Sequence, residues 1–401
     1  MTSTSTIHFR KKMFSCKTSF LVFMLTVCCG SVFSQFRLHI DLRQRPSSHI
    51  NDSIFVAGNF NGWNPGDSGF RLIKHGETYS MDIRNLAADV YQFKFTRGHW
   101  GKSETTADGK TLANRLVKLE SDTSLQFEVE GWADDFAAVE KHHTASSNVS
   151  VLDSAFFIPQ LGRTRKIWIY LPPGYNTTKK KYPVLYMHDG QNLFDDYTSA
   201  YGEWGVDEWL DSLIETGKPA SIVVGIENGA KRMIEYNPDD NSEFGIGEGK
   251  QYAEFIANTL KPFIDAHYRT LASRENTFVA GSSMGGLISY YCMLQYPAVF
   301  GKAGVFSPAF WTAPHIMELT DSLSGNMKGQ FFFFAGELEG GSMVPDMEKI
   351  ADKLGSDSHS LIYAVVDPAG RHNEPTWRKW FGEFYLWIMG NGLSYQIKTQ
   401  D

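Results

Sequence analysis

The feature that most constrains the fold is a glycine-rich turn at residues 281–285, Gly-Ser-Ser-Met-Gly. A short apolar run leads into the turn and a helical pattern leaves it, so the motif Gly-x-Ser-x-Gly stands between a strand and a helix. Ser283 would sit on a strained turn that lifts its hydroxyl above the sheet, and the two glycines remove side chains that would collide there. The pattern predicts that Ser283 is a nucleophile and that the Met284 amide stabilises an oxyanion. The alternative is a glycine-rich turn with an incidental serine.

Length and charge narrow the class of protein. A chain of 401 residues suggests about two domains. With 42% hydrophobic and 21% charged residues, it has an ordinary globular composition. The formal net charge of -7 argues against a nucleic-acid partner, because phosphate binding needs concentrated lysine and arginine.

Residues 1–34 read as a secretory signal. A basic segment at residues 10–17 precedes an apolar run at residues 19–30, and cleavage is expected before Gln35. We therefore expect a secreted or periplasmic protein. The apolar run is short for a membrane span, so a stable membrane insertion is not expected, and lipid attachment at Cys28 is the less favoured alternative. Only Cys292 would remain after cleavage, which excludes an internal disulfide in the mature chain.

Two compositional patterns follow the signal. Residues 35–130 hold short alternating segments separated by Gly, Asn, Pro and Asp, which predicts an immunoglobulin-like all-β sandwich. Residues 131–150 read as a polar linker. Residues 151–395 alternate strands with helices, which predicts a doubly wound, mostly parallel sheet.

The second region yields specific expected elements. Several of its strands are continuous apolar runs, as expected for strands buried on both faces. The expected helices are 206–215, 251–267, 287–295, 346–354 and 376–389, and the expected strands are 166–171, 183–187, 222–226, 277–280, 303–306, 330–335 and 361–366.

Three motifs of this region, in order, resemble the esterase family that includes esterase D, feruloyl and acetyl-xylan esterases, and enterochelin esterases. They are Tyr-Pro-Val-Leu-Tyr-Met-His-Asp-Gly-Gln-Asn-Leu-Phe-Asp at residues 182–195, the turn at 281–286, and Gly-Arg-His-Asn-Glu at 370–374 with Trp377. The resemblance covers roughly residues 150–390. It implies an α/β-hydrolase fold and a serine hydrolase of carboxylic esters that needs no cofactor. We see no metal-ligand spacing either.

A serine hydroxyl needs a neutral imidazole as base, and the imidazole needs a carboxylate to orient it. In this fold the chain order is serine, acid, histidine, and His372 lies in the loop before the last expected helix. The loop after the strand 330–335 holds Glu337 and Glu339. The family pattern places the acid three residues after the glycine, which favours Glu339, with Glu337 and Asp367 as alternatives.

The resemblance also implies further site residues. Gln191 is our choice for the second oxyanion amide, with the neighbouring Gly190 amide as the alternative. His188 is expected to pack beneath this turn. Trp204, Trp377 and Asn373 are candidates for substrate contact.

The N-terminal region resembles the starch- and glycogen-binding modules (carbohydrate-binding module family 48). The resemblance rests on residues 56–65, Val-Ala-Gly-Asn-Phe-Asn-Gly-Trp-Asn-Pro, and residues 91–100, which end in Gly-His-Trp. Trp63 and Trp100 are candidates to stack on sugar rings, with core or interdomain packing as the alternative.

The sequence favours a secreted serine esterase that removes acyl or feruloyl groups from polysaccharides. Its partner would be a small ester or an acylated polysaccharide. A periplasmic siderophore esterase that opens enterochelin-type trilactones is the second hypothesis, and a non-catalytic sugar-binding protein is the third. Because every expected triad and oxyanion residue follows residue 150, we also expect the N-terminal region to be dispensable for small esters.

Overall fold

The structure is a computed structural model that describes residues 35–137, 141–390 and 397–399. These described residues all fall within one compact unit. The expected signal at residues 1–34, and residues 391–395 at the end of the expected second domain, lie outside the described residues. Across the described ranges, no helix combines the length and the apolar character that a membrane crossing requires. We refer to residues 35–137 as the N-terminal module and to residues 141–390 as the C-terminal domain.

The N-terminal module is built from short strands, as the alternating pattern predicts. One sheet has the order β3-β4-β1-β8, a second has the order β2-β5-β7, and β6 pairs with β9. All pairs are antiparallel except β1 with β8. Phe93, Phe95 and Trp132 lie fully buried in the core that the strands share. The strands are β1 Phe36–Gln44, β2 Phe55–Gly58, β3 Ile73–His75, β4 Thr78–Leu86, β5 Asp89–Thr96, β6 Glu104–Thr105, β7 Arg115–Leu119, β8 Thr123–Glu128 and β9 Gly131–Trp132.

The segment expected as a linker, residues 131–150, makes contacts near both of its ends. Trp132 belongs to the core of the module, so the packed region extends past residue 130. Further along, the backbone amides of Thr144 and Ser146 donate to the carboxylates of Asp195 (3.0 Å) and Asp207 (2.6 Å). The last part of the expected linker is therefore held against the C-terminal domain by acidic side chains of that domain.

The C-terminal domain has one mixed sheet with the order β10-β11-β13-β12-β14-β15-β16-β17-β18. The strands from β13 to β18 in this order are parallel, whereas β10 and β11 pair antiparallel at one edge. The strands are β10 Val149–Ile158, β11 Arg163–Tyr170, β12 Val184–His188, β13 Ile222–Ile226, β14 Thr277–Ser282, β15 Lys302–Phe306, β16 Gln330–Gly336, β17 Leu361–Asp367 and β18 Ile397–Thr399.

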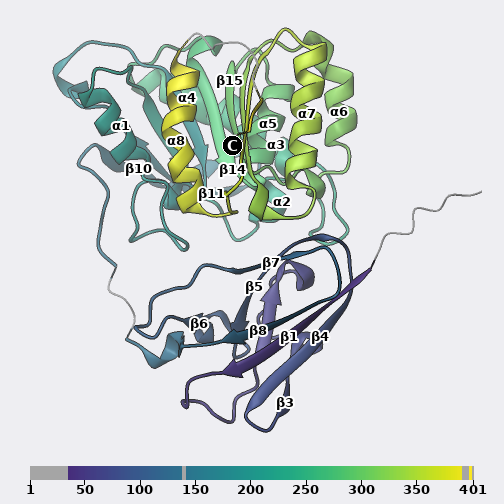
Figure 1. Ribbon diagram of the computed structural model, residues 1–401. Helices are drawn as coiled ribbons and strands as arrows, with labels where there is room; N and C mark the ends of the chain where they lie inside the picture. Colours follow the sequence, from purple (N-terminus) through teal and green to yellow (C-terminus); the bar gives the residue numbers. More distant parts are fainter. Residues whose placement is uncertain (1–34, 138–140, 391–396, 400–401) are drawn as a thin grey trace, which may run out of the picture. The chain divides into compact units, whose positions relative to one another are not determined.

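Helices cover both faces of this sheet (Figure 1). The alternation along β16 separates the two layers, because Phe331 and Phe333 join one buried cluster and Phe332 and Phe334 join the other. Helices α1 and α8 pack on the second cluster, and α3 to α7 supply the first. The helices are α1 Val206–Glu215, α2 Arg232–Glu235, α3 Gly249–Phe255, α4 Lys261–His267, α5 Met284–Gln295, α6 Ile316–Leu323, α7 Met343–Asp357 and α8 Glu374–Met389.

Most expected elements of this domain are present, with instructive differences. The helix expected at 206–215 has those bounds, and the one expected at 251–267 contains a π-helical turn, Ile256–Leu260, between α3 and α4. Strand β10 and helix α6 were not predicted. Strand β10 is an edge strand whose register shifts repeatedly against β11, so its apolar residues do not alternate regularly.

Candidate active site

The turn at Ser283 has the strained geometry that its glycines predict. Ser283 has φ 58° and ψ -121° and stands between β14 and α5. A Cβ added to Gly281 would lie 3.0 Å from the His188 ring, and one added to Gly285 would lie 3.3 Å from the Cβ of His188. The two glycines thus permit the close approach of His188 at the end of β12, and Ser283 remains partly accessible between buried neighbours.

The loop after β15 holds the backbone of Ser283 from both sides. The amide of Ser283 donates to the carbonyl of Phe306 (2.9 Å), and the amide of Ala309 donates to the carbonyl of Ser283 (3.1 Å). Ser307 lies between these two contacts and also has a positive φ of 43°. The loop therefore fixes Ser307 close to the serine turn.

Glu339 meets His372 as the preferred assignment expects. Its Oε2 lies 2.7 Å from Nδ1 of His372. Its Oε1 accepts hydrogen bonds from the hydroxyl of Ser307 and from the amide of Gly336, both at 2.7 Å. The Glu339 side chain is only 1% exposed, so these three contacts satisfy a buried carboxylate.

The two alternative acids lie elsewhere. Glu337 is exposed on the same loop. Asp367 accepts from the ammonium group of Lys379 (2.7 Å) and from the indole of Trp380 (2.8 Å). Of the three carboxylates that the sequence offered, Glu339 is the one with a hydrogen bond to His372.

The candidates for substrate contact have structural partners. Trp377 donates from its indole to the hydroxyl of Ser307 (2.9 Å) and meets the ring of His372 edge-on at 5.1 Å. Trp204 stacks on Trp377, and both are buried. Asn373 caps α8 by accepting from the amide of Thr376 at 3.1 Å. The tryptophans therefore support His372 from the core, and Asn373 fixes the start of the helix that follows it.

The turn after β12 reaches the same edge of the sheet as the serine turn, because β12 and β14 are parallel neighbours. Asp189 there has φ 56° and a buried carboxylate that accepts from the guanidinium of Arg232 at 2.7 and 2.8 Å. Burial alone would raise the pKa of Asp189, but the charge and hydrogen bonds of Arg232 and Asn228 outweigh it and lower that pKa. The amide of Asn228 also donates to Oε1 of Gln191 (3.2 Å), which orients the expected oxyanion residue.

His188 is buried beneath this turn, where the sequence analysis places it. Its Nδ1 lies 3.1 Å from the hydroxyl of Tyr252. Burial lowers the pKa of His188 to about 3, so the ring is neutral at physiological pH. A histidine without charge, packed against two tyrosine rings, has a structural role in positioning the turn.

Sequence reasoning missed two parts of this site, Ser307 and the Asp189–Arg232 ion pair. Ser307 is followed by a proline after a strand, which is not distinctive by itself. Asp189 lies within the family motif, but its partner is 43 residues away, so the pairing had no local signal.

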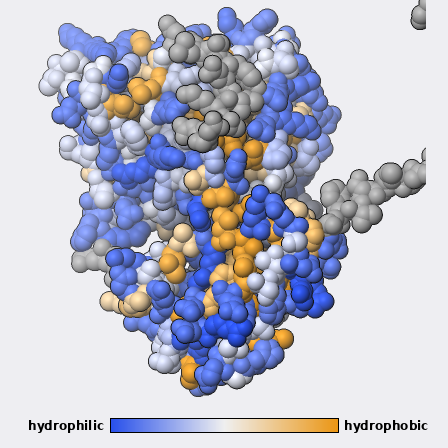
Figure 2. Space-filling view, in the orientation of Figure 1, coloured by the Kyte–Doolittle hydropathy of each residue, from blue (hydrophilic) through white to orange (hydrophobic). Residues whose placement is uncertain are grey.

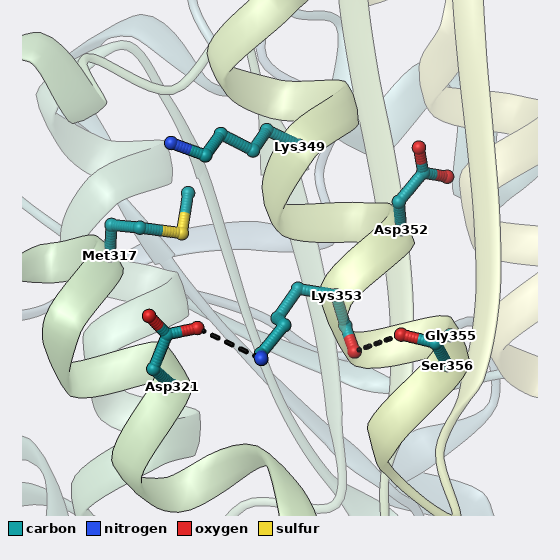
Figure 3. Close-up of a pocket in the computed structure, with 7 residues that line it drawn as sticks. All are labelled: Met317, Asp321, Lys349, Asp352, Lys353, Gly355 and Ser356. Carbon is teal, nitrogen blue, oxygen red and sulfur yellow. Dashed lines mark hydrogen bonds and ion pairs between the residues drawn. The ribbon is translucent and has the colours of Figure 1, made fainter. Parts of the chain in front are cut away.

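Two other features share no residue with this site. In the N-terminal module, His49, Asp134 and Asp135 lie close enough together to hold a cation, but all three are exposed and Asp134 is paired with Arg97. An open groove lies between α6 and α7 (Figure 3). There Lys353 pairs with Asp321 at 3.1 Å. The residues that line the groove are Met317, Asp321, Lys349, Asp352, Lys353, Gly355 and Ser356.

Glu374 provides a test of the electrostatics beside His372. Its buried carboxyl accepts from the side-chain amide of Asn192 (3.3 Å), and burial raises its pKa from 4.5 to about 7. Because the folded-state pKa is raised, the protonated carboxyl is favoured in the fold, and stability is lost progressively as the pH rises from about 4.5 to about 7.

We therefore expect Glu374→Gln to raise the free energy of unfolding at pH 8.5 by up to about 3 kcal/mol and to change it little at pH 4, below the pKa of the unfolded carboxyl. Gln mimics the protonated carboxyl, so the benefit should grow as the pH rises from about 4.5 to about 7 and then stay constant. Urea unfolding at the two pH values measures this difference. An equal effect at both pH values would contradict the assignment.

Comparison with known proteins identifies relatives of the C-terminal domain. The family model described as "Putative esterase" matches residues 158–332. The Bacillus subtilis protein YjcH is 30% identical over 176 residues, which covers 43% of this chain and 67% of YjcH.

Two relatives have the names of enzymes. The endo-1,4-beta-xylanase/feruloyl esterase of Xylanibacter ruminicola is 29% identical over 159 residues, which covers 38% of this chain and 20% of that protein. The iron(III) salmochelin esterase of Escherichia coli is 27% identical over 237 residues, which covers 54% of this chain and 52% of that protein. The chain thus spans about half of one relative and a fifth of the other.

A solved structure supports the fold. The enterochelin esterase from Shigella flexneri matches with a TM-score of 0.51 at 14% identity and covers 84% of this chain and 87% of that one. The predicted α/β-hydrolase fold of the C-terminal domain, with its mixed sheet, is confirmed. On the matched family model and the identity with YjcH, the chain belongs to this esterase family, a family of carboxylic ester hydrolases.

Proposed function

We propose that this protein hydrolyses carboxylic esters through an acyl-enzyme on Ser283. The observation that carries the proposal is the 2.7 Å contact between the buried carboxylate of Glu339 and Nδ1 of His372. A carboxylate in this position holds the proton on Nδ1 and leaves Nε2 free to act as a base. Family membership and the strained serine turn support the same assignment.

The reaction follows from these roles. Nε2 of His372 takes the hydroxyl proton of Ser283 as Oγ attacks the ester carbonyl. The imidazolium, stabilised by Glu339, returns that proton to the departing alcohol as the acyl–oxygen bond breaks. Water then attacks the acyl-enzyme with the same base, which releases the acid and restores the Ser283 hydroxyl.

The developing oxyanion would be bound by two backbone amides. That of Met284 stands at the N-terminus of α5, where the helix dipole favours negative charge. That of Gln191 follows β12, and the contacts of Asp189 with Arg232 and Asn228 keep this turn rigid. Preorganised donors of this kind account for a large share of the rate enhancement in acyl transfer.

The favoured substrates are acyl or feruloyl groups on polysaccharides. A relative named as a xylanase and feruloyl esterase and the expected export signal at residues 1–34 support this choice. The relative named as a salmochelin esterase supports the alternative, a siderophore lactone. Rates of hydrolysis of methyl ferulate, p-nitrophenyl acetate and ferric enterobactin by the purified protein distinguish the two.

The N-terminal module would bring the enzyme to glycan. Trp63 and Trp100 lie with their ring centroids 6.3 Å apart, and Trp100 is 41% exposed. Paired, accessible indole rings suit the apolar faces of sugar rings. The same pair would serve the remaining hypothesis, a sugar-binding protein without catalysis.

Ser283→Ala should lower kcat/KM on p-nitrophenyl acetate at least about 10⁴-fold, because it removes the nucleophile and the triad acts as a unit. A fluorophosphonate should label Ser283 in the native protein, as located by peptide mass spectrometry. The neighbouring Ser282 is the internal control. Label on Ser282, or an active Ser283→Ala variant, would refute the mechanism.

Glu339→Gln should reduce kcat about 10²–10⁴-fold, since an amide no longer stabilises the imidazolium. The matched variant Glu337→Gln, an identical change two residues away on the exposed side of the loop, should remain within about twofold of the native kcat. Steady-state kinetics on the same ester give both values. The reverse order of effects would assign the acid to Glu337.

Trp100→Ala should weaken binding to an insoluble acylated polysaccharide about five- to tenfold, which corresponds to about 1 kcal/mol of aromatic contact. Trp311→Ala, which removes an exposed indole from the C-terminal domain, is the control and should bind normally. A depletion assay measures both. If the Trp100→Ala variant binds the polysaccharide as tightly as the native protein does, the indole pair has a packing role instead.

A further inference from the structure

The loop that carries Glu339 is bonded to the N-terminal module. The side-chain amide of Gln92, on β5, donates to the carbonyl of Leu338 at 2.7 Å and to that of Glu339 at 3.5 Å. Gln92 is 5% exposed. A buried side chain of the module thus contacts the backbone of the residue that orients His372.

The same loop has a second anchor. Both carboxylate oxygens of Asp89 accept from the amide of Gly341, at 2.7 and 2.9 Å. Gly340, between the two anchors, has φ 75°, and a Cβ there would lie 2.3 Å from the carbonyl oxygen of Val90. The loop and β5 approach so closely that only glycine fits between them.

The loop that carries His372 joins the same network. The side-chain amide of Asn114 donates to Oε1 of Gln92 (3.3 Å), and the backbone carbonyl of Asn114 accepts from the guanidinium of Arg371 (3.1 Å). The two loops also bond to each other, from the amide of Leu338 to the carbonyl of Gly370 at 3.1 Å. Gln92 therefore belongs to a network that reaches the acid and the residue before the base.

The position of this network matters for chemistry. A small displacement of a catalytic group costs much of its rate advantage, because proximity and orientation supply a large part of catalysis. The inner side of the acid loop is fixed by Ser307 and Gly336 within the C-terminal domain. Its outer side, residues 338–341, is fixed by Gln92 and Asp89.

We propose that Gln92 and Asp89 are positioning residues for Glu339, and that the N-terminal module completes the catalytic geometry. This inference rests on the proposed esterase function. It revises the expectation that the module is dispensable for small esters. The triad residues all come from the C-terminal domain, but the module holds the backbone of residues 338–341, which orients Glu339.

The test uses the full-length protein and p-nitrophenyl acetate, which is too small to need a glycan-binding surface. Asp89→Ala removes the acceptor of the Gly341 amide, and Gln92→Met removes the donor to Leu338 while keeping the length of the side chain. Each should lower kcat about tenfold and leave KM within about twofold, because the change acts on the chemical step. Asp89→Asn keeps one acceptor oxygen and should restore most of the native kcat.

Asp82→Ala is the matched control. Asp82 lies on β4 of the same module and bonds to His39 (2.8 Å) and Arg84 (2.7 Å). It should lower the thermal stability of the module by an amount similar to Asp89→Ala without changing kcat. If Asp82→Ala reduces kcat as much as Asp89→Ala, the effect is one of module stability and the proposal is overturned.

A double-mutant cycle locates the effect. In the Glu339→Gln background, Gln92→Met should cost nothing further, since its influence runs through the carboxylate that is already gone. An undiminished tenfold loss there would overturn the positioning role. A native protein with no esterase activity would refute the proposed function, whereas an active native protein with unaffected Gln92 and Asp89 variants would refute only this inference.

Discussion

The site depends on a carboxylate buried beside an imidazole. Removing Glu339 from water is unfavourable unless hydrogen bonds replace its hydration. Ser307, the Gly336 amide and His372 supply them; Ser307 and His372 lie in the loops after β15 and β17, and Gly336 is the last residue of β16. The arrangement of β15, β16 and β17 as parallel neighbours brings these three strand ends together.

The sequence predicts the parts of the protein that short-range chemistry determines. The serine turn can be predicted from the sequence because the glycine spacing and the flanking strand and helix patterns all fall within about ten residues. The helix at 206–215 and the buried strand 330–335 are likewise encoded in local periodicity and apolar runs. The choice of Glu339 over Glu337 needed a family pattern as well, because both acids stand on one short loop.

Hydrogen bonds between residues far apart in the chain could not be predicted from the sequence. Asp89 and Gly341 are 252 residues apart, and Gln92 and Leu338 are 246 apart, so no local pattern joins them. Gln92 lies in a strand whose alternation of polar and apolar residues predicts only that it belongs to the module. Nothing in the neighbouring sequence indicates that its side chain contacts the C-terminal domain. The face drawn in Figure 2 is mostly hydrophilic with a band of apolar residues, and surface hydropathy of this kind does not report hydrogen bonds between buried polar groups.

The two sides of Ser283 are held by different means. On the side of the proposed oxyanion amide of Gln191, the turn after β12 is fixed within the domain by the ion pair between the buried Asp189 and Arg232, whose charges neutralise each other. On the acid side, neutral backbone groups are fixed by the side chains of another module. An ion pair inside one domain forms whenever that domain folds, whereas the acid loop acquires its outer contacts only when the module is folded as well. Folding of the module and full alignment of Glu339 are therefore coupled, although the module contributes no reacting atom.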